Sequence, residues 1–383
     1  MRKSTPAYEY VQALKKRYRK ARKKVRGAML SEFVSVTGYH RKHAAMILSG
    51  RFKPKVGRIR RRRGRIYTDE DKRAVWKIAG WFDQIGSKRL RAAMDQELDR
   101  LRQAGHLEVS DGSFEHLKRI SPATMDRMRS QQRVAGRRLQ GGTKPGSLLK
   151  TQVPIRTFAD WDDKRVGFVE VDLVQHDGGR PSGIFGCTLH LTDVSSGWCE
   201  PIAVENKAQK RVFEALRVVR VRLPFQLLGI DSDNGSEFIN AELIAYCDLN
   251  KLTFTRGRVG RKNDNPFVEQ KNYSVVRRLV GYDRYDTPAQ IALLNRLYDL
   301  YRLYVNYFMP VTKLIAKERD GHRTRKIYDD PKTPYQRVRD FADLTEIQKR
   351  ALSNEYAALD VVALRGQIDA LLDKLQPSPI RED

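Results

Sequence analysis

The chain has 383 residues, 40% of them hydrophobic, so it is long enough for roughly two to four domains and too apolar to be intrinsically disordered. Its three cysteines are an odd number without a C-x-x-C pair, which argues against a disulfide framework or a zinc site and predicts a reducing, cytoplasmic location. No apolar run approaches the roughly 20 residues that cross a bilayer, and the basic N-terminus lacks a signal-peptide core, so we expect no membrane partner.

The net charge of +28 belongs to the N-terminal part of the chain. Residues 1–150 contain 39 Lys and Arg against 13 Asp and Glu, whereas residues 151–383 contain 35 against 33. A basic half of this density is typical of a protein that binds a polyanion, and nucleic acid is the commonest one. A highly solvated surface is the alternative.

Residues 1–50 predict a first helix-turn-helix DNA-binding domain. Apolar side chains recur at helical spacing over residues 6–26, and two shorter apolar faces follow, separated by Gly38 and closed by Gly50. In a helix-turn-helix, the start of the second helix contacts base edges in the major groove. The residues at that start, and therefore the predicted DNA contacts, are His40, Arg41, Lys42 and His43. An ordinary helical hairpin is the alternative.

Residues 51–66 predict a basic arm or linker. Nine of the fifteen residues 51–65 are Lys or Arg, which leaves too few apolar side chains for a core. We expect an extended arm along phosphates or in a minor groove, with a solvated linker as the alternative. The predicted DNA contacts of this arm are Arg60, Arg61, Arg62 and Arg63.

Residues 67–133 predict a second domain like a helix-turn-helix. Helices are expected over residues 69–84, 88–104 and 121–131, and Ser121 followed by Pro122 is a signal for a helix start. Arg127 and Arg129 would face DNA, unless these helices are only a spacer. Residues 134–155 then contain several glycines among polar residues, which is typical of a linker.

Over residues 156–310 the pattern changes to strands and helices. Strands are expected over residues 166–174, 184–193, 198–204, 225–231 and 252–256. Helices are expected over residues 206–222, 237–250, 267–280 and 287–307. The first strand is apolar on both faces, which indicates burial within a sheet. Antiparallel strands followed by β-α-β pairs form the arrangement of ribonuclease H, so we predict an α/β core of this kind.

Three carboxylates stand on separate elements of this core. Asp172 is at the centre of the first strand, Asp233 follows the fourth strand in D-S-D-N-G-S-E-F, and Glu269 lies in P-F-V-E-Q-K-N. A carboxylate in an apolar strand is costly unless it is paired or bound to metal. Hard divalent cations take oxygen ligands, so the three acids predict a metal site. Coincidence is the alternative, and Asp231 is a rival to Asp233 as the second ligand.

On these motifs, residues 160–310 resemble the catalytic core of retroviral integrases and related bacterial insertion-sequence transposases. Asp172, Asp233 and Glu269 match the three acids (DDE) of that superfamily; the D-N-G turn matches as well, and 35 residues separate the second acid from the third. The resemblance implies a transposase that cleaves the ends of a mobile element and joins the 3′-hydroxyls to target DNA. It also implies a homodimer or larger oligomer on double-stranded DNA, at the bacterial nucleoid. The DNA would comprise the terminal inverted repeats of the element and the target.

Such a site would use two Mg²⁺ or Mn²⁺ ions, which activate the attacking oxygen and stabilise the leaving one. Asp172 would bridge both ions, while Asp233 and Glu269 would each hold one. The lysines that follow the glutamate in the family are replaced by Tyr273 and Val276. Other side chains are therefore candidate contacts to the DNA end, namely Arg261, Lys262, Lys271, Asn272 and Arg277.

Two features stay open at this point. His176, just after the first strand, is either a residue that lines the site or an ordinary turn histidine. Residues 311–383 predict a C-terminal region that begins with short strands or an extended docking arm and continues with helices over residues 346–356 and 360–375. Two rival functions also remain, a metal-dependent nuclease that cannot join strands and a catalytically inactive DNA-binding regulator.

Overall fold

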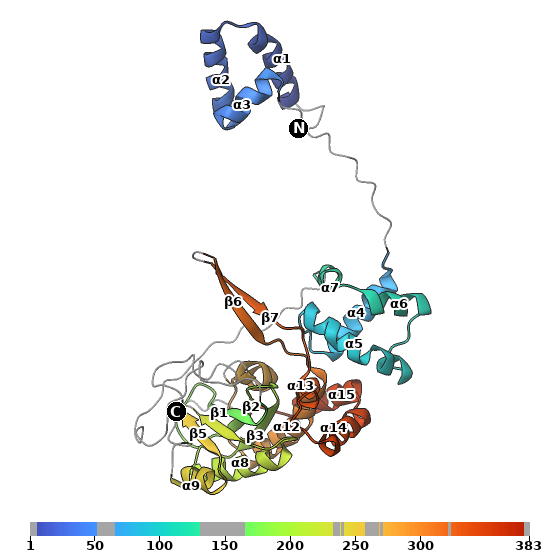
Figure 1. Ribbon diagram of the computed structural model, residues 1–383, viewed down its shortest axis with the longest axis vertical. Coiled ribbons are helices and arrows are strands. Elements are labelled where there is room, and N and C mark those ends of the chain that lie inside the picture. The colour runs from blue at the N-terminus through green and yellow to red at the C-terminus, as the bar shows by residue number, and fades with distance from the viewer. Residues whose placement is uncertain are drawn as a thin grey trace. The chain divides into compact units, whose positions relative to one another are not determined.

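The computed structural model of the protein describes residues 6–51, 66–130, 165–232, 238, 241–256, 268, 271–320 and 323–378. The chain divides into two compact units, Met1–Ile66 and Tyr67–Asp383, and Figure 1 shows the elements of each. The segments predicted as a basic arm over residues 51–66 and as a linker over residues 134–155 lie almost entirely outside the described residues. Within the described ranges, no helix has the length and the apolar character needed to cross a membrane.

The first unit contains three helices, α1 (Pro6–Lys20), α2 (Lys23–Thr37) and α3 (Arg41–Ser49). They enclose a core of their own, in which Phe33, Ala44 and Leu48 are fully buried. α2 ends at Gly38, whose φ of 67° lies in the left-handed region that glycine adopts without strain. The chain then enters α3 within three residues, so the structure has the two predicted helices on either side of Gly38.

Four helices open the second unit, α4 (Asp69–Trp81), α5 (Ser87–Gln103), α6 (Asp111–Arg119) and α7 (Pro122–Arg129). α7 begins with Ser121 as its cap and Pro122 in its first turn, which are the start signals seen in the sequence. We did not predict α6. Its start has a local cap, because the Ser110 hydroxyl accepts from the Ser113 N–H. The Ser110 N–H and hydroxyl also donate to the Glu70 carboxylate of α4.

These four helices share one hydrophobic core with the rest of the second unit. The Tyr304 hydroxyl donates to the Trp81 carbonyl at 2.8 Å, and the Arg100 guanidinium donates to the Leu359 carbonyl at 2.6 Å. The Arg100 guanidinium also lies over the ring of Tyr356, 4.3 Å from its centroid. The segment predicted as a domain over residues 67–133 therefore lies within the same compact unit as the sheet.

The sheet of the second unit has five strands in the order β3-β2-β1-β4-β5. Its strands are β1 (Phe168–Gln175), β2 (Cys187–Asp193), β3 (Cys199–Val204), β4 (Gly229–Ser232) and β5 (Thr253–Arg256). β1, β2 and β3 are antiparallel neighbours, whereas β4 and β5 join on the other side of β1 as parallel strands. All five predicted strands are confirmed, and β1 is the middle strand, as its apolar character indicated.

Helices flank this sheet (Figure 1). α8 (Gln209–Arg222) contacts β2 and β3, α9 (Ala241–Leu249) contacts β5, and α12 (Pro288–Phe308) contacts β3. The predicted helix over residues 267–280 is a π-helix, η2 (Asn272–Arg277), over most of its described length and continues as α11 (Arg278–Val280). π-helical turns are rare and occur often at functional sites.

The outer edge of β3 is satisfied by two asparagines of α12. The Asn306 amide accepts from the Cys199 N–H at 2.9 Å and donates to the Cys199 carbonyl at 2.8 Å. The Asn295 amide makes the same pair of bonds with Ala203, at 2.8 and 3.0 Å. Pro201, midway between them, has no N–H to satisfy. At Cys199 and Ala203 the polar groups that an edge strand exposes are thus paired inside the unit.

We expect Asn306→Ala to lower the free energy of unfolding of the second unit by about 1–3 kcal/mol. The substitution removes both hydrogen bonds to Cys199, so the buried N–H and carbonyl of Cys199 lose these partners. All four tryptophans follow residue 66, so tryptophan fluorescence during urea unfolding reports on this unit. Arg296→Ala, on the exposed side of the same helix, should change the value by less than about 0.5 kcal/mol.

The C-terminal region consists of a hairpin and three helices. The hairpin is formed by β6 (Leu314–Asp320) and β7 (Arg323–Tyr328), so the predicted short strands are present. The helices α13 (Pro334–Arg339), α14 (Glu346–Ala358) and α15 (Val361–Leu372) follow. Leu364, Ile368 and Leu371 of α15 are buried in the common core.

Candidate active site

Asp172 lies at the centre of β1 and is half-buried. Its carboxylate accepts hydrogen bonds from the Leu173 N–H at 2.8 Å and from the side-chain amide of Asn272. Asn272 is the first residue of η2, so the second bond ties this π-helix directly to the middle strand of the sheet. These bonds stabilise a charged group that would otherwise be costly within an apolar strand.

His190 holds the other side of the Asn272 amide. It lies opposite Asp172 in the register of β1 and β2, and its Nδ1 is 2.7 Å from the Asn272 Oδ1. Complete burial lowers the pKa of His190 to about 4; the ammonium of Lys271 adds to this effect, and the hydrogen bond with Asn272 opposes it. The imidazole is therefore neutral near pH 7. Since a carboxylate only accepts, the amide nitrogen must face Asp172, and its oxygen then accepts from the Nδ1–H of His190.

Two further acids lie on the same face of the sheet. Glu170, two residues before Asp172, is fully buried and accepts from the Val268 N–H at 2.7 Å. Its register partner on β4 is Asp231, which is also buried and accepts from the Thr255 hydroxyl of β5. Asp231 is thus bonded inside the sheet, which weakens its case as a metal ligand in place of Asp233.

Two predicted DNA contacts of this region lie close to other parts of the chain. The Lys271 side chain lies beside Gly197, in the turn between β2 and β3. The Arg277 guanidinium donates to the Gln175 carbonyl at 2.8 Å and lies over the ring of Tyr282, 4.6 Å from its centroid. Burial lowers the pKa of Arg277 from its usual value. Asn272 serves Asp172, as described above.

The predicted DNA contacts of the first unit lie together at the start of α3. His40 caps this helix by accepting from the Lys42 N–H, and the Arg41 guanidinium donates to the Ser31 hydroxyl at 3.0 Å. His40, Arg41 and Lys42 are exposed, and His43 is half-buried with its ring edge-on to Tyr39. This surface combines three basic or imidazole side chains at one helix N-terminus.

In α7 the two predicted arginines differ. Arg127 bonds only within its own helix, to the Ala123 carbonyl and the Thr124 hydroxyl, among the contacts of the described residues. Arg129 donates to the Ile85 carbonyl at 2.6 Å and to the Gln84 carbonyl at 2.9 Å. Arg129 therefore anchors α7 to the turn after α4.

His176 is fully buried just beyond β1. Its Nε2 is hydrogen-bonded to the Thr188 hydroxyl at 2.7 Å, and that hydroxyl is 2.8 Å from the Tyr298 hydroxyl of α12. Burial, assisted by the nearby Arg277, lowers the pKa of His176 to about 3. The geometry favours a neutral core histidine over a residue that lines the site.

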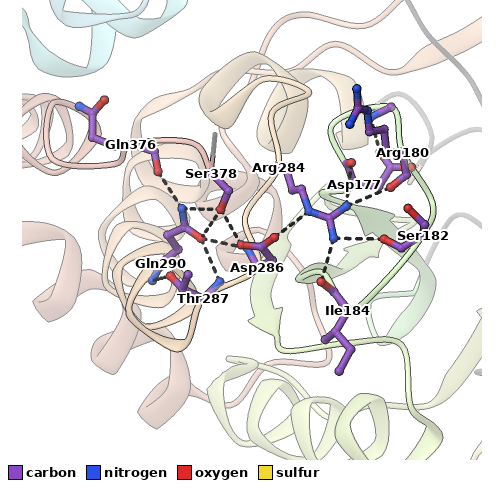
Figure 2. Close-up of polar contacts among 11 residues, drawn as sticks. Asp177, Arg180, Ser182, Ile184, Arg284, Asp286, Thr287, Gln290, Gln376 and Ser378 are labelled. Atoms are coloured by element: carbon purple, nitrogen blue, oxygen red, sulfur yellow. Dashed lines mark hydrogen bonds and ion pairs between the residues drawn. The ribbon is translucent and has the colours of Figure 1, made fainter. Parts of the chain in front are cut away.

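The loop that follows β1 is held by one arginine, which Figure 2 shows. The Arg284 guanidinium donates to four backbone carbonyls, and its Nε bonds the Asp286 carboxylate at 2.7 Å. Asp286 in turn accepts from the Ser378 hydroxyl near the described C-terminal end. The four carbonyls belong to Asp177, Arg180, Ser182 and Ile184. A single side chain thus fixes the turn that follows the strand of Asp172.

Several predicted residues lie outside the part of the chain that the structure describes. They are Asp233, Glu269, Arg60, Arg61, Arg62, Arg63, Arg261 and Lys262. Within the described part, no group of three or more His, Cys, Asp or Glu side chains is arranged to hold a metal ion. Of the three acids predicted to bind metal, the described part includes Asp172, whose oxygens are the hard ligands that Mg²⁺ takes.

Sequence reasoning missed Glu170, His190 and Arg284. Glu170 carried a signal, because it alternates with Asp172 along one strand and so lies on the same face. His190 would have required the register of β2 against β1. Arg284 had no local signal, because its carbonyl partners are 100 or more residues away in sequence.

The strand order and the acid at its centre define a mixed α/β protein with a candidate acidic site on the middle strand of the sheet. The chain is 41% identical over 333 residues to the uncharacterized protein y4rM of Sinorhizobium fredii (strain NBRC 101917 / NGR234), and the alignment covers 86% of this chain and 94% of that protein. The chain belongs to the same family as y4rM. No family model matches the sequence.

Two solved structures are similar to part of the chain. One is the HTLV-2 integrase catalytic core domain in complex with magnesium, in its dimeric form, at 15% identity and a TM-score of 0.28, over 38% of this chain and 88% of that one. The other is the catalytic core domain of BIV integrase, at 16% identity and a TM-score of 0.31, over 50% of this chain and 98% of that one.

Proposed function

We propose that the protein is a DNA transposase of the DDE class, which cleaves the ends of a mobile element and joins them to target DNA. The observation that supports this most is the hydrogen bond from Asn272 to the Asp172 carboxylate. It joins the middle strand of a ribonuclease-H-like sheet to Asn272. Asn272 lies three residues after Glu269, which matches the third acid in the sequence pattern of the integrase-like superfamily.

The described neighbours of the other two acids support a shared site. Asp233 directly follows Ser232, which is paired in register with Val171, the residue before Asp172. Glu269 directly follows Val268, whose N–H donates to Glu170. The described residues that precede these two acids in the sequence are therefore both bonded to β1, the strand of Asp172. The proposal therefore assigns Asp172, Asp233 and Glu269 to one catalytic site.

The oxygens of these three acids would hold the two Mg²⁺ or Mn²⁺ ions. When bound, two such ions supply activation of the attacking oxygen and stabilisation of the leaving oxygen in phosphodiester chemistry. The chain contributes orientation. Neutral His190 fixes the Asn272 amide, and Asn272 in turn holds one oxygen of Asp172 and leaves the half-buried carboxylate accessible.

The DNA contacts belong to the same proposal. The exposed N-terminus of α3 in the first unit would contact base edges in the major groove. The arginines of residues 60–63, with Arg127, Arg261, Lys262, Lys271 and Arg277, would contact phosphates along the DNA. Because two element ends must react together, we propose that the protein acts as a dimer or larger oligomer on DNA.

A strand-transfer assay tests the proposal. Purified protein is incubated with Mg²⁺, a supercoiled target plasmid and a labelled duplex that carries the sequence flanking the coding region. We expect labelled DNA joined to the plasmid. Cleavage without joined products would identify a nuclease, and binding without cleavage would identify a catalytically inactive regulator. Either of those two results would refute the transposase assignment.

A further inference from the structure

The β6–β7 hairpin is an arm with exposed faces. Figure 1 shows its two strands extending as a ribbon away from the five-stranded sheet. Among the described residues, the one ion pair made by side chains of β6 or β7 is internal to the hairpin, between Arg325 and Glu318. Ile315 and Tyr328 are 66% and 50% exposed, although both are large and apolar. A lone two-stranded hairpin is at best marginally stable in water, so contact with a binding partner would stabilise it.

Charge is distributed unevenly between the two faces of the hairpin. Residues 313–328 contain six Lys and Arg against two acids. This local excess of basic residues is larger than the excess over all of residues 151–383, which contain 35 Lys and Arg against 33 acids. Glu318 pairs in register with Arg325, and their side chains form an ion pair at 3.9 Å. The next positions along the strands lie on the other face, where Arg319 and Lys326 are exposed.

The positions of that second face carry basic residues and no acid. Lys326 is the register partner of Lys317, and Arg319 is the partner of Thr324, so these four positions include three basic residues and no acid. The exposed Arg319 and Lys326 would attract a polyanion bound to this face. On the opposite face, Glu318 already forms an ion pair with Arg325.

The base of the hairpin is firmly fixed. The Arg337 guanidinium bonds the Asp329 carboxylate at 2.7 Å and donates to the Val311 carbonyl at 3.0 Å. The Lys313 ammonium donates to the Val194 carbonyl, in the turn between β2 and β3. Gly197 of the same turn lies near Val311 and near Lys271, the residue that immediately precedes Asn272. The arm is thus rooted beside the turn that also contacts the segment of the candidate active site.

We propose that the β6–β7 hairpin is a DNA-binding arm that presents Arg319 and Lys326 to a groove of double-stranded DNA. The major groove is about 12 Å wide and admits a two-stranded β-ribbon. DNA is the polyanion that the proposed function supplies, so the choice of partner rests on that proposal. An arm rooted beside the candidate site would hold the duplex near the carboxylates.

Site-directed cross-linking tests the arm in the full-length protein. All three native cysteines are buried, so a thiol-directed photo-cross-linker should attach selectively to a cysteine introduced by Lys326→Cys. The matched control is Ile347→Cys on α14, where the native side chain is 81% exposed. With a labelled linear duplex and EDTA in place of metal, we expect several-fold more protein–DNA adduct from position 326 than from position 347. Equal yields, or cross-links to a second copy of the chain instead of DNA, would overturn the proposal.

Charge substitutions give a second measurement. Loss of two phosphate contacts through Arg319→Gln with Lys326→Gln should reduce the slope of log affinity against log salt by about 1.8, at about 0.9 per contact. Arg325→Gln removes one charge from the other face and should leave the slope nearly unchanged; a slope insensitive to the double substitution argues against the arm. Both measurements omit metal, so the arm can stand if strand transfer fails, and strand transfer can stand if the arm fails.

Discussion

Asp172→Asn should lower the rate of DNA cleavage by about a thousandfold or more and leave DNA affinity within about twofold. The substitution keeps the size of the side chain and removes the charge that would hold the divalent ions. Metal-ion stabilisation of a phosphodiester transition state contributes several kcal/mol, and each 1.36 kcal/mol corresponds to a tenfold change in rate. The measurement is single-turnover cleavage of a labelled duplex in Mg²⁺, together with a binding titration in EDTA.

Three companion variants sharpen this test. Asp248→Asn makes the same chemical change on the exposed surface of α9 and should cleave at the wild-type rate. Glu269→Gln should match Asp172→Asn. Asp231→Asn should mainly lower stability, because that acid is buried and accepts from Thr255. Normal cleavage by Asp172→Asn would remove the catalytic assignment, and inactivity of a well-folded Asp231→Asn protein would move the second ligand to Asp231.

His176→Gln should make the free energy of unfolding less dependent on pH at acid pH. Between pH 7.5 and pH 4.5, the wild type should lose about 3 kcal/mol more than the variant. Burial lowers the pKa of His176 to about 3, from an ordinary value of 6.5. The unfolded chain therefore takes up a proton as pH falls below 6.5, while the folded chain does not. The stabilising contribution is fully present above pH 6.5 and is lost as pH falls toward 3, by 1.36 kcal/mol for each pH unit.

The comparison of variant with wild type isolates this one histidine. Glu200 acts in the opposite sense, because burial raises its pKa to about 7, so its contribution is lost as pH rises from 4.5 to 7. His190 acts in the same sense as His176. Both effects cancel in the difference between the two unfolding free energies measured by urea and tryptophan fluorescence. His40→Gln, in the first unit, serves as the control. A pH-independent difference would mean that His176 is not a neutral core residue.

The sequence was sufficient for elements whose pattern is local. The five strands have the expected places because runs such as residues 166–174 are apolar, β-branched and bounded by turns. The helices on either side of Gly38 and the start of α7 at Ser121 depend on glycine and capping chemistry within a few residues. Asp172 was identifiable because a charged residue is rarely found in the centre of such a strand.

The remainder depends on contacts between distant parts of the chain. The Asn272 amide is hydrogen-bonded to Asp172, 100 residues away in sequence, and to His190, 82 residues away. No local sequence pattern predicts either bond. The π-helical form of η2 was not predictable from residues that read as an ordinary helix. Likewise, the linker composition of residues 134–155 suggested that the preceding helices form a separate domain. In the structure, Trp81 is hydrogen-bonded to Tyr304 of α12, and Arg100 is hydrogen-bonded to Leu359 at the end of α14.

The outer edge of β3 also limits how copies of the protein can associate. Cys199 and Ala203 have both of their outward backbone groups occupied by asparagine amides, and Pro201 has no hydrogen to offer. A strand from another molecule would find no N–H donor to use at these three positions, and the carbonyls of Cys199 and Ala203 are already occupied. Continuous intermolecular sheets, including those that begin aggregation, are therefore blocked on this side. Any oligomer that forms on DNA must be built through other surfaces.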